Sequence, residues 1–209
     1  VTEVSLWSGE SLSDKSILVI GEQGIGDTLM FARLLSLLSG AKKVYLLPDE
    51  RLIPIFRRSF PDITTLTTSE LLSSVKPNSL DYQIPIGSLC RLASTSFHDS
   101  IATSRCFLPD TKKSDAFRRS YLSHKDKKFI VGISWIGGGR KDRIPAKSID
   151  LHLWADLLSH PDAQFISLQY GDVSKIINTY NSQRGLDLIH DPSVNPLADM
   201  DTWLSQVQA

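Results

Sequence analysis

The stretch SILVIGEQGIGD, residues 16–27, decides the fold that the sequence predicts. Its first five residues are mostly apolar and β-branched, as in a buried strand. Three glycines then form a turn, and the apolar spacing of residues 28–38 is that of an amphipathic helix. Strand, glycine-rich turn and helix in this order predict the opening unit of a parallel α/β sheet.

The same alternation continues through the first half of the chain. Further strands are predicted at residues 43–47, 63–66 and 81–84, and helices at 49–59 and 69–75. Regular alternation of strand and helix implies right-handed βαβ units and a doubly wound, mostly parallel sheet. Residues 87–107 lose this periodicity and are expected to be irregular.

A second strand and helix series follows a helix expected at 110–122 and a charged segment at 124–128. The charged segment predicts a boundary between an N-terminal lobe, 1–124, and a C-terminal lobe, 125–209. Strands are predicted at 129–135, 164–169 and 186–190, and helices at 151–159, 172–183 and 199–208.

Three strands make a thin second sheet with an unprotected edge. We therefore expect an incomplete second lobe, either because the chain is a piece of a longer protein or because the natural protein is truncated. We also expect self-association into a homodimer through that edge.

Composition excludes several classes of protein. The 23 basic and 23 acidic residues cancel, so no overall field attracts nucleic acid or an anionic membrane. No apolar run approaches the roughly 20 residues that span a bilayer. Cys90 and Cys106 lack the spacing of a zinc site, and His152 and His160 are a weak metal candidate. These features predict a cytoplasmic protein with reduced thiols, no transmembrane segment, no metal and no nucleic-acid partner.

Gly21, Gly24 and Gly26 place a glycine-rich turn where doubly wound folds bind ligands. Their spacing is not the dinucleotide fingerprint G-x-G-x-x-G, and Asp27 stands where a phosphate loop has lysine. A carboxylate there repels phosphate and favours a hydroxyl or a sugar. Asp27 has two interpretations: it caps the following helix by accepting N–H bonds from the next turn, or it acts as a base.

A second glycine-rich turn, residues 137–139, leads into a cluster of cations: Arg140, Lys141, Arg143 and Lys147. Such a cluster can neutralise a diphosphate leaving group as its bond to a sugar breaks. The alternative is an ordinary solvated loop.

Residues 6–10 and 16–33, LWSGE and SILVIGEQGIGDTLMFAR, resemble the start of the glycosyltransferase domain that follows tetratricopeptide repeats in many bacterial proteins. That domain is similar to the ADP-heptose:lipopolysaccharide heptosyltransferases and, more distantly, to the O-linked N-acetylglucosamine transferases. Residues 131–135, 147–149 and 165–171 resemble the same family in the same order.

This resemblance implies a GT-B fold, with two Rossmann-like doubly wound parallel sheets, the acceptor bound mainly by the first lobe and the donor mainly by the second. By position, Asp27 is the base that deprotonates the acceptor hydroxyl, and Lys147 and Gln169 face the donor nucleotide. No cofactor is implied, because a nucleotide diphosphate sugar is the donor substrate.

The leading hypothesis is an inverting sugar transfer to a hydroxyl of a glycan or protein acceptor, with the two turns facing each other across one groove. The alternative is a non-catalytic, truncated module that mediates interactions or binds sugars. A third, a nicotinamide-dependent dehydrogenase with Asp49 or Glu50 holding a ribose, has the wrong glycine spacing.

Overall fold

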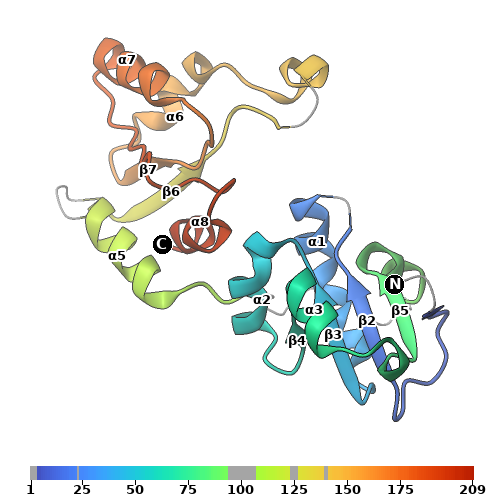
Figure 1. The fold of residues 1–209 in the computed structure, drawn as a ribbon. Helices are drawn as coiled ribbons and strands as arrows, with labels where there is room; N and C mark the ends of the chain where they lie inside the picture. Colours follow the sequence, from blue (N-terminus) through green and yellow to red (C-terminus); the bar gives the residue numbers. More distant parts are fainter. Residues whose placement is uncertain (1–3, 23, 94–106, 123–126, 139–140) are drawn as a thin grey trace. The chain divides into compact units, whose positions relative to one another are not determined.

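The structure is a computed structural model that describes residues 4–22, 24–93, 107–122, 127–138 and 141–209 (Figure 1). The chain divides into two compact units, Val1–Leu108 and Pro109–Ala209, and each is described by itself. The division lies before the predicted boundary at 124/125, because helix α5 (Thr111–Leu122) packs within the second unit. There Tyr121 accepts a 2.8 Å hydrogen bond from Gln206 of helix α8 (Met200–Val207).

Unit 1 contains a five-stranded parallel sheet in the order β1-β5-β2-β3-β4. Its strands are β1 (Ser5–Leu6), β2 (Ser16–Ile20), β3 (Lys43–Leu47), β4 (Thr64–Thr65) and β5 (Tyr82–Pro85). β2 and β3 have the predicted bounds, and β1 was not predicted. The chain leaves β2 toward β3 and β4 on one side, whereas β5 pairs on the other side. The strand order therefore reverses between β2 and β5, and ligands of doubly wound sheets bind at such a reversal.

The helices of unit 1 are short. They are α1 (Ile25–Phe31), α2 (Ile53–Ser59), α3 (Thr68–Ser74) and the 3-10 helices η1 (Ala32–Leu38), η2 (Glu50–Leu52), η3 (Pro77–Ser79) and η4 (Ile86–Arg91). β2 has a continuous apolar sequence because both faces of the sheet are covered at this strand. Ile17, Leu18 and Val19 are all fully buried. On one face Leu18 packs with Leu71 of α3.

The first helix differs from its prediction. It begins at Ile25 rather than Thr28 and tightens into η1 at Ala32. The earlier start follows from Gly24, whose extended backbone (φ −95°, ψ 164°) makes it the N-cap. The irregular stretch expected at 87–107 begins instead with η4 (Ile86–Arg91), while 94–106 lie outside the described residues.

Unit 2 has two parallel paired strands, β6 (Phe129–Ile133) and β7 (Ala163–Ser167). The third predicted strand is reduced to one parallel bridge between Ile166 and Ile189. All five residues of β7 are buried, whereas most of β6 is exposed or half-buried. The second sheet is therefore partial, and in the described residues β6 pairs on one side only.

Helices cover this sheet and complete unit 2. They are α5, α6 (Ala155–Leu158), α7 (Ser174–Arg184), α8 and the 3-10 helices η5 (Lys141–Arg143), η6 (Pro145–Lys147) and η7 (Leu151–Trp154). Ile133, Leu158, Phe165 and Ile177 belong to one core cluster. None of the helices in the described parts of the chain has the length and apolar character that a bilayer crossing requires.

Candidate functional site

The first turn lies at the carboxyl end of β2, and its glycines have different roles. Gly21 is required by close packing, since a Cβ there would lie 2.9 Å from the Cα of Pro48, and its N–H donates to Leu47 O at 2.8 Å. A Cβ on Gly26 would meet no atom within 4 Å among the described residues. Packing therefore explains Gly21 and leaves the space at Gly26 open.

Asp27 does not cap the helix in the expected way. It is the third residue of α1. Its Oδ2 accepts a 3.3 Å hydrogen bond from the backbone N–H of Gly24, which precedes it in the chain. Thr28, which is buried, donates its hydroxyl to Gly24 O at 3.2 Å. Asp27 is half-buried, and among the described residues its Oδ1 accepts no hydrogen bond. One carboxylate oxygen of Asp27 therefore orders the turn.

A second carboxylate, which the sequence analysis missed, lies at the strand-order reversal. A Cβ built on Gly87, in the turn after β5, would lie 3.0 Å from Oε1 of Glu22 and 3.4 Å from the ring of Phe31. The turns after β2 and β5 thus meet at Glu22 and Gly87. No local pattern joins residues this far apart in the chain, although a glycine three residues after a predicted strand was a usable signal.

The second turn lies at the carboxyl end of β6, and its glycines fit between two side chains. A Cβ on Gly137 would come within 2.5 Å of the Cβ of Lys147, and one on Gly138 within 2.5 Å of the hydroxyl of Tyr170. Ser148 closes the loop: its Oγ accepts from Gly137 N at 3.0 Å and donates to Ile144 O at 2.6 Å. The turn is an ordered loop at its base.

The four cations that were predicted to bind phosphate differ in their contacts and in how far the structure describes them. Lys147 ends η6, packs against Gly137 and is exposed. Arg143 is exposed at the end of η5, which begins at Lys141. Arg140 lies outside the described residues. Among the described side chains of this cluster, Lys147 is the one that contacts the glycine turn.

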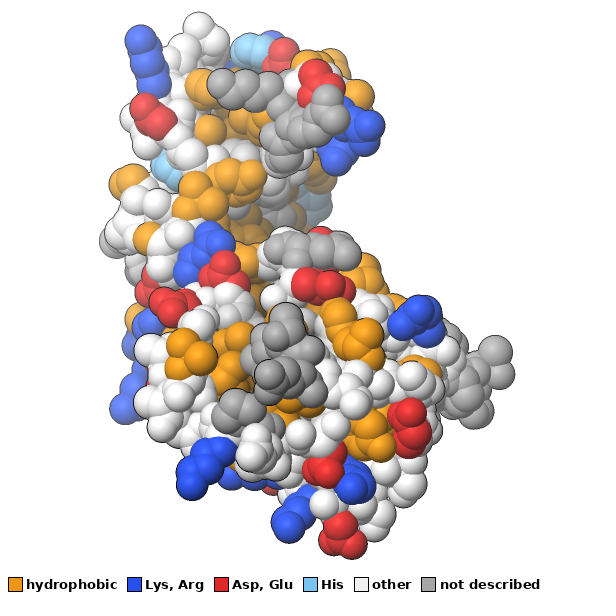
Figure 2. Space-filling view, turned by 45° about the vertical axis from the view of Figure 1, so that its right-hand side comes forward, with side chains coloured by type: hydrophobic (Ala, Val, Ile, Leu, Met, Phe, Trp, Pro, Cys, Tyr) orange, Lys and Arg blue, Asp and Glu red, His pale blue; other side chains and the backbone are white. Residues whose placement is uncertain are grey.

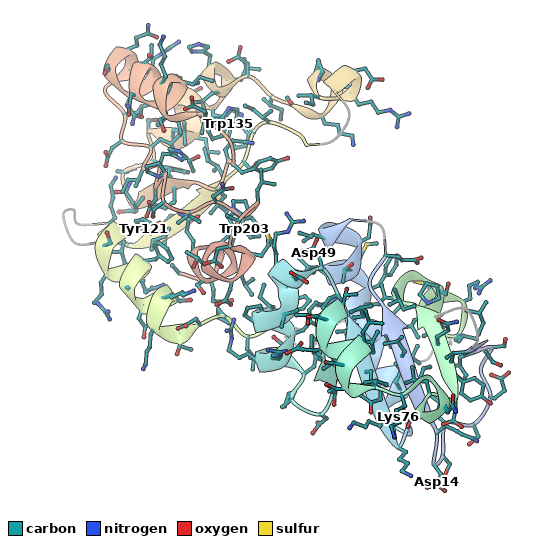
Figure 3. All side chains as sticks on the ribbon, in the orientation of Figure 1. Asp14, Asp49, Lys76, Tyr121, Trp135 and Trp203 are labelled. Carbon is teal, nitrogen blue, oxygen red and sulfur yellow. The ribbon has the colours of Figure 1, made fainter. Side chains whose placement is uncertain are left out.

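Gln169 follows β7 and is only 5% exposed. Its Oε1 accepts three hydrogen bonds, from Ser134 Oγ at 3.0 Å, from the Trp135 N–H at 3.2 Å and from the Ile136 N–H at 2.9 Å. Figure 3 shows Trp135 where β6 ends. Gln169 therefore fixes the start of the second turn, a positioning role in addition to the predicted contact with the donor, which stays a prediction.

A pocket of about 300 Å³ with a mixed polar and apolar lining opens beside Gln169 at the carboxyl edge of the second sheet. Tyr170, Asp172, Ser174, His190 and Asn195 contribute to its lining. Burial lowers the pKa of His190, and its Nδ1 is buried without a hydrogen-bond partner among the described residues. The volume is at the low end of small-molecule sites, and the lining suits a ligand with polar and apolar parts.

The side chains that the sequence analysis considered for ribose or metal binding already make other contacts. Asp49, labelled in Figure 3, accepts hydrogen bonds from Nε and Nη2 of Arg51 at 2.9 and 2.8 Å, so its carboxylate is already paired where a ribose would bind. His152 packs on Tyr180 and His160 on Phe129. In the described residues no three His, Cys, Asp or Glu side chains gather in a way that could hold a metal.

On the face that Figure 2 shows, basic and acidic side chains alternate without a large area of one sign. A pocket of about 370 Å³ in unit 1, lined by Arg33, Lys42 and Phe60 among others, lies at the amino end of β3, away from both turns. The candidate site therefore consists of the two turns and the pocket beside Gln169, each within its own unit.

Comparisons with known proteins agree with this architecture. No protein-family model matches the chain. Over 210 residues the chain is 26% identical to Protein FlbA of Caulobacter vibrioides, an alignment that covers 93% of this chain and 35% of FlbA. The chain thus spans about a third of the length of this curated relative.

The fold is similar to that of a glycosyl transferase family 9 protein from Veillonella parvula, with a TM-score of 0.65 over 95% of this chain and 75% of that one. At 12% identity this similarity establishes the fold alone. The protein is an α/β protein with parallel sheets, the second partial, and its fold is similar to that of this glycosyl transferase family 9 protein.

Proposed function

We propose that this chain carries a glycosyltransferase function: transfer of a sugar from a nucleotide diphosphate sugar to a hydroxyl acceptor, with inversion at the anomeric carbon. The observation that carries the proposal is the opposite chemistry of the two turns on a fold shared with a glycosyltransferase. Carboxylates occupy the first turn, and packed glycines beside a lysine occupy the second. Because one fold serves many functions, the chemistry of the turns supports the proposal more than the fold does.

In this proposal Asp27 is the general base. The acceptor hydroxyl transfers its proton to the Asp27 carboxylate while its oxygen forms a bond to the anomeric carbon. The bond from that carbon to the donor phosphate breaks, and the electron pair leaves with the nucleoside diphosphate. Two carboxylates, Asp27 and Glu22, make the first turn unsuited to phosphate and suited to a hydroxyl-bearing acceptor.

The second unit receives the donor. The pocket beside Gln169 takes the nucleoside, and Lys147 stabilises the negative charge that develops on the departing diphosphate. Arg140, Lys141 and Arg143 add positive charge on the same loop. Gln169 contributes by ordering residues 134–136, so that the glycines after them present their backbone to the phosphates.

The same proposal includes the finer expectations of the sequence. These are a relation to the ADP-heptose transferases and to domains that follow tetratricopeptide repeats, a glycan or protein acceptor, and a cytoplasmic location. No metal or cofactor enters the scheme.

Calorimetric titration of the chain with ADP, UDP and GDP tests donor binding. We expect one of the three to bind, and Lys147→Ala to weaken it at least tenfold, because a charge-assisted contact to phosphate is lost. Lys112→Ala, which removes an exposed lysine on α5, is the matched control. Binding of none of the three would leave the non-catalytic module as the function of this chain.

Turnover tests the base. With the donor that binds, Asp27→Asn should retain nucleotide affinity and lose at least a hundredfold in transfer rate, the usual range for removing a general base. Asp62→Asn, an exposed aspartate at the amino end of the sheet, is the control. Full transfer activity in Asp27→Asn would exclude Asp27 as the base.

A further inference from the structure

Two neighbouring glycines of the second turn are each approached by a side chain from elsewhere in unit 2. A Cβ on Gly137 would lie 2.5 Å from the Cβ of Lys147. A Cβ on Gly138 would lie 2.5 Å from the hydroxyl of Tyr170 and 3.7 Å from the ring carbon that carries it. The hydroxyl is therefore the part of the Tyr170 side chain that comes nearest to the turn.

This hydroxyl lies where a ligand can reach it. Tyr170 is 41% exposed, and both Gly138 and Lys147 are exposed. Without a Cβ, the two glycines allow a ligand to approach the backbone of the turn closely. The turn therefore brings together an exposed backbone, a lysine and a phenolic hydroxyl.

A buried glutamine connects Tyr170 to the turn. Oε1 of Gln169 accepts hydrogen bonds from the N–H groups of Trp135 and Ile136, directly before Gly137. Nε2 of the same side chain donates to the Tyr170 carbonyl at 3.4 Å. The backbone on both sides of the contact is therefore held by one side chain, which lowers the entropy that ligand binding costs.

The surroundings of Tyr170 indicate which ligand its hydroxyl meets. Tyr170 lines the pocket beside Gln169, to which the proposed function assigns the nucleoside. Its hydroxyl lies at the turn beside Lys147, to which that function assigns the diphosphate. Lysine and tyrosine both supply hydrogen-bond donors, and donors to charged phosphate oxygens form stronger bonds than donors to neutral acceptors.

We propose that Tyr170 is a further donor-binding residue, whose hydroxyl donates a hydrogen bond to the diphosphate of the bound nucleotide. Lys147, beside the neighbouring glycine, supplies the positive charge. This inference rests on the proposed function, because the diphosphate belongs to the donor substrate. The bond from Tyr170 strengthens as negative charge develops on the departing diphosphate.

Titration of the whole chain with ADP, UDP and GDP, and with adenosine, uridine and guanosine, tests this role. Calorimetry measures the nucleotide affinities, and ligand-observed NMR measures those of the nucleosides. Tyr170→Phe should weaken binding of the nucleotide roughly tenfold, the effect of one lost hydrogen bond, and leave binding of the matching nucleoside unchanged because the ring remains. Tyr82→Phe, the same change on β5 of unit 1, is the control and should change neither affinity.

Gly138→Ala is a second variant, which places a methyl group where the Tyr170 hydroxyl lies. It should weaken nucleotide binding, and it should cause little further loss in the Tyr170→Phe chain, where the hydroxyl is absent. Fully additive losses would contradict the placement of the hydroxyl at Gly138.

The other outcomes separate this inference from the proposed function. Equal nucleotide affinity in the native chain and in Tyr170→Phe would overturn the role of Tyr170 and leave the proposed donor site in place. Equal weakening of nucleotide and nucleoside would also overturn it, because the hydroxyl would then act on the base or on the fold. Binding of no nucleotide by the native chain would remove the donor site itself, and this inference with it.

Discussion

Replacing Gln169 by methionine removes the acceptor that orders the second turn while keeping the side-chain volume close to the original. Gln169 is buried, and its Oε1 accepts from two backbone N–H groups and one hydroxyl. A buried donor left without a partner costs about 1–3 kcal/mol. The Trp135 bond is buried, whereas the Ile136 and Ser134 bonds are partly buried and are open to replacement by water.

We therefore expect Gln169→Met to destabilise unit 2 by about 1–3 kcal/mol, most of it from the buried Trp135 amide. Urea unfolding followed by tryptophan fluorescence measures the free energy, and amide hydrogen exchange of Trp135 and Ile136 locates the loss. Gln183→Met makes the same chemical change at an exposed position on α7 and should stay within about 0.5 kcal/mol of the native chain.

An unchanged urea midpoint in Gln169→Met, with full exchange protection at Trp135 and Ile136, would refute the ordering role of Gln169. A loss of stability without any change at these two amides would also contradict it, because the effect would then arise elsewhere. Weaker nucleotide binding by a folded Gln169→Met chain would connect the ordered turn to the proposed donor site.

Three further predictions concern the turns, the pH response and the sheet edge. Gly137→Ala should destabilise the chain by about 1–3 kcal/mol and lower its thermal midpoint, because the added Cβ would lie 2.5 Å from the Cβ of Lys147. Gly26→Ala lies in α1 with open space around it, so it should be neutral or stabilising by up to about 1 kcal/mol. Equal effects of the two substitutions would contradict the packing described at Gly137. Burial holds the pKa of His190 below its ordinary value, so just below a pH of about 6.5 the unfolded chain binds more protons than the folded one, and the urea midpoint of unit 2 should fall as the pH drops through that value. His190→Asn should remove this part of the dependence of the urea midpoint on pH. An identical pH dependence in the variant would exclude His190 as its source. The half-exposed β6, paired on one side only among the described residues, should support a homodimer at high protein concentration, and strictly monomeric sedimentation would count against it.

Local pattern was sufficient for most elements of the fold. β2 and β3 have the predicted bounds, and the bounds of α7 and α8 lie within two residues of the predicted ones. These elements could be predicted because strand and helix patterns depend on the apolar character of residues close together in the chain. The boundary of the units and the short β1 escaped prediction, because both depend on partners far along the chain, α8 in one case and β5 in the other.

The candidate site shows the same division. The sequence alone marked both glycine turns, Asp27 and Lys147, since glycine spacing and charge are visible without a structure. One of the two interpretations of Asp27 was a cap that accepts N–H bonds from the following turn. The tertiary structure instead shows a contact back to Gly24, because the helix begins three residues earlier than its pattern suggests.

Only the tertiary structure brought Glu22 to Gly87 and buried Gln169 beneath the second turn. The physical reason is that strand and helix periodicity depends on residues within a few positions of each other. Burial and hydrogen-bond pairing instead depend on which strand ends the crossovers bring together, and that is decided by packing of the whole unit.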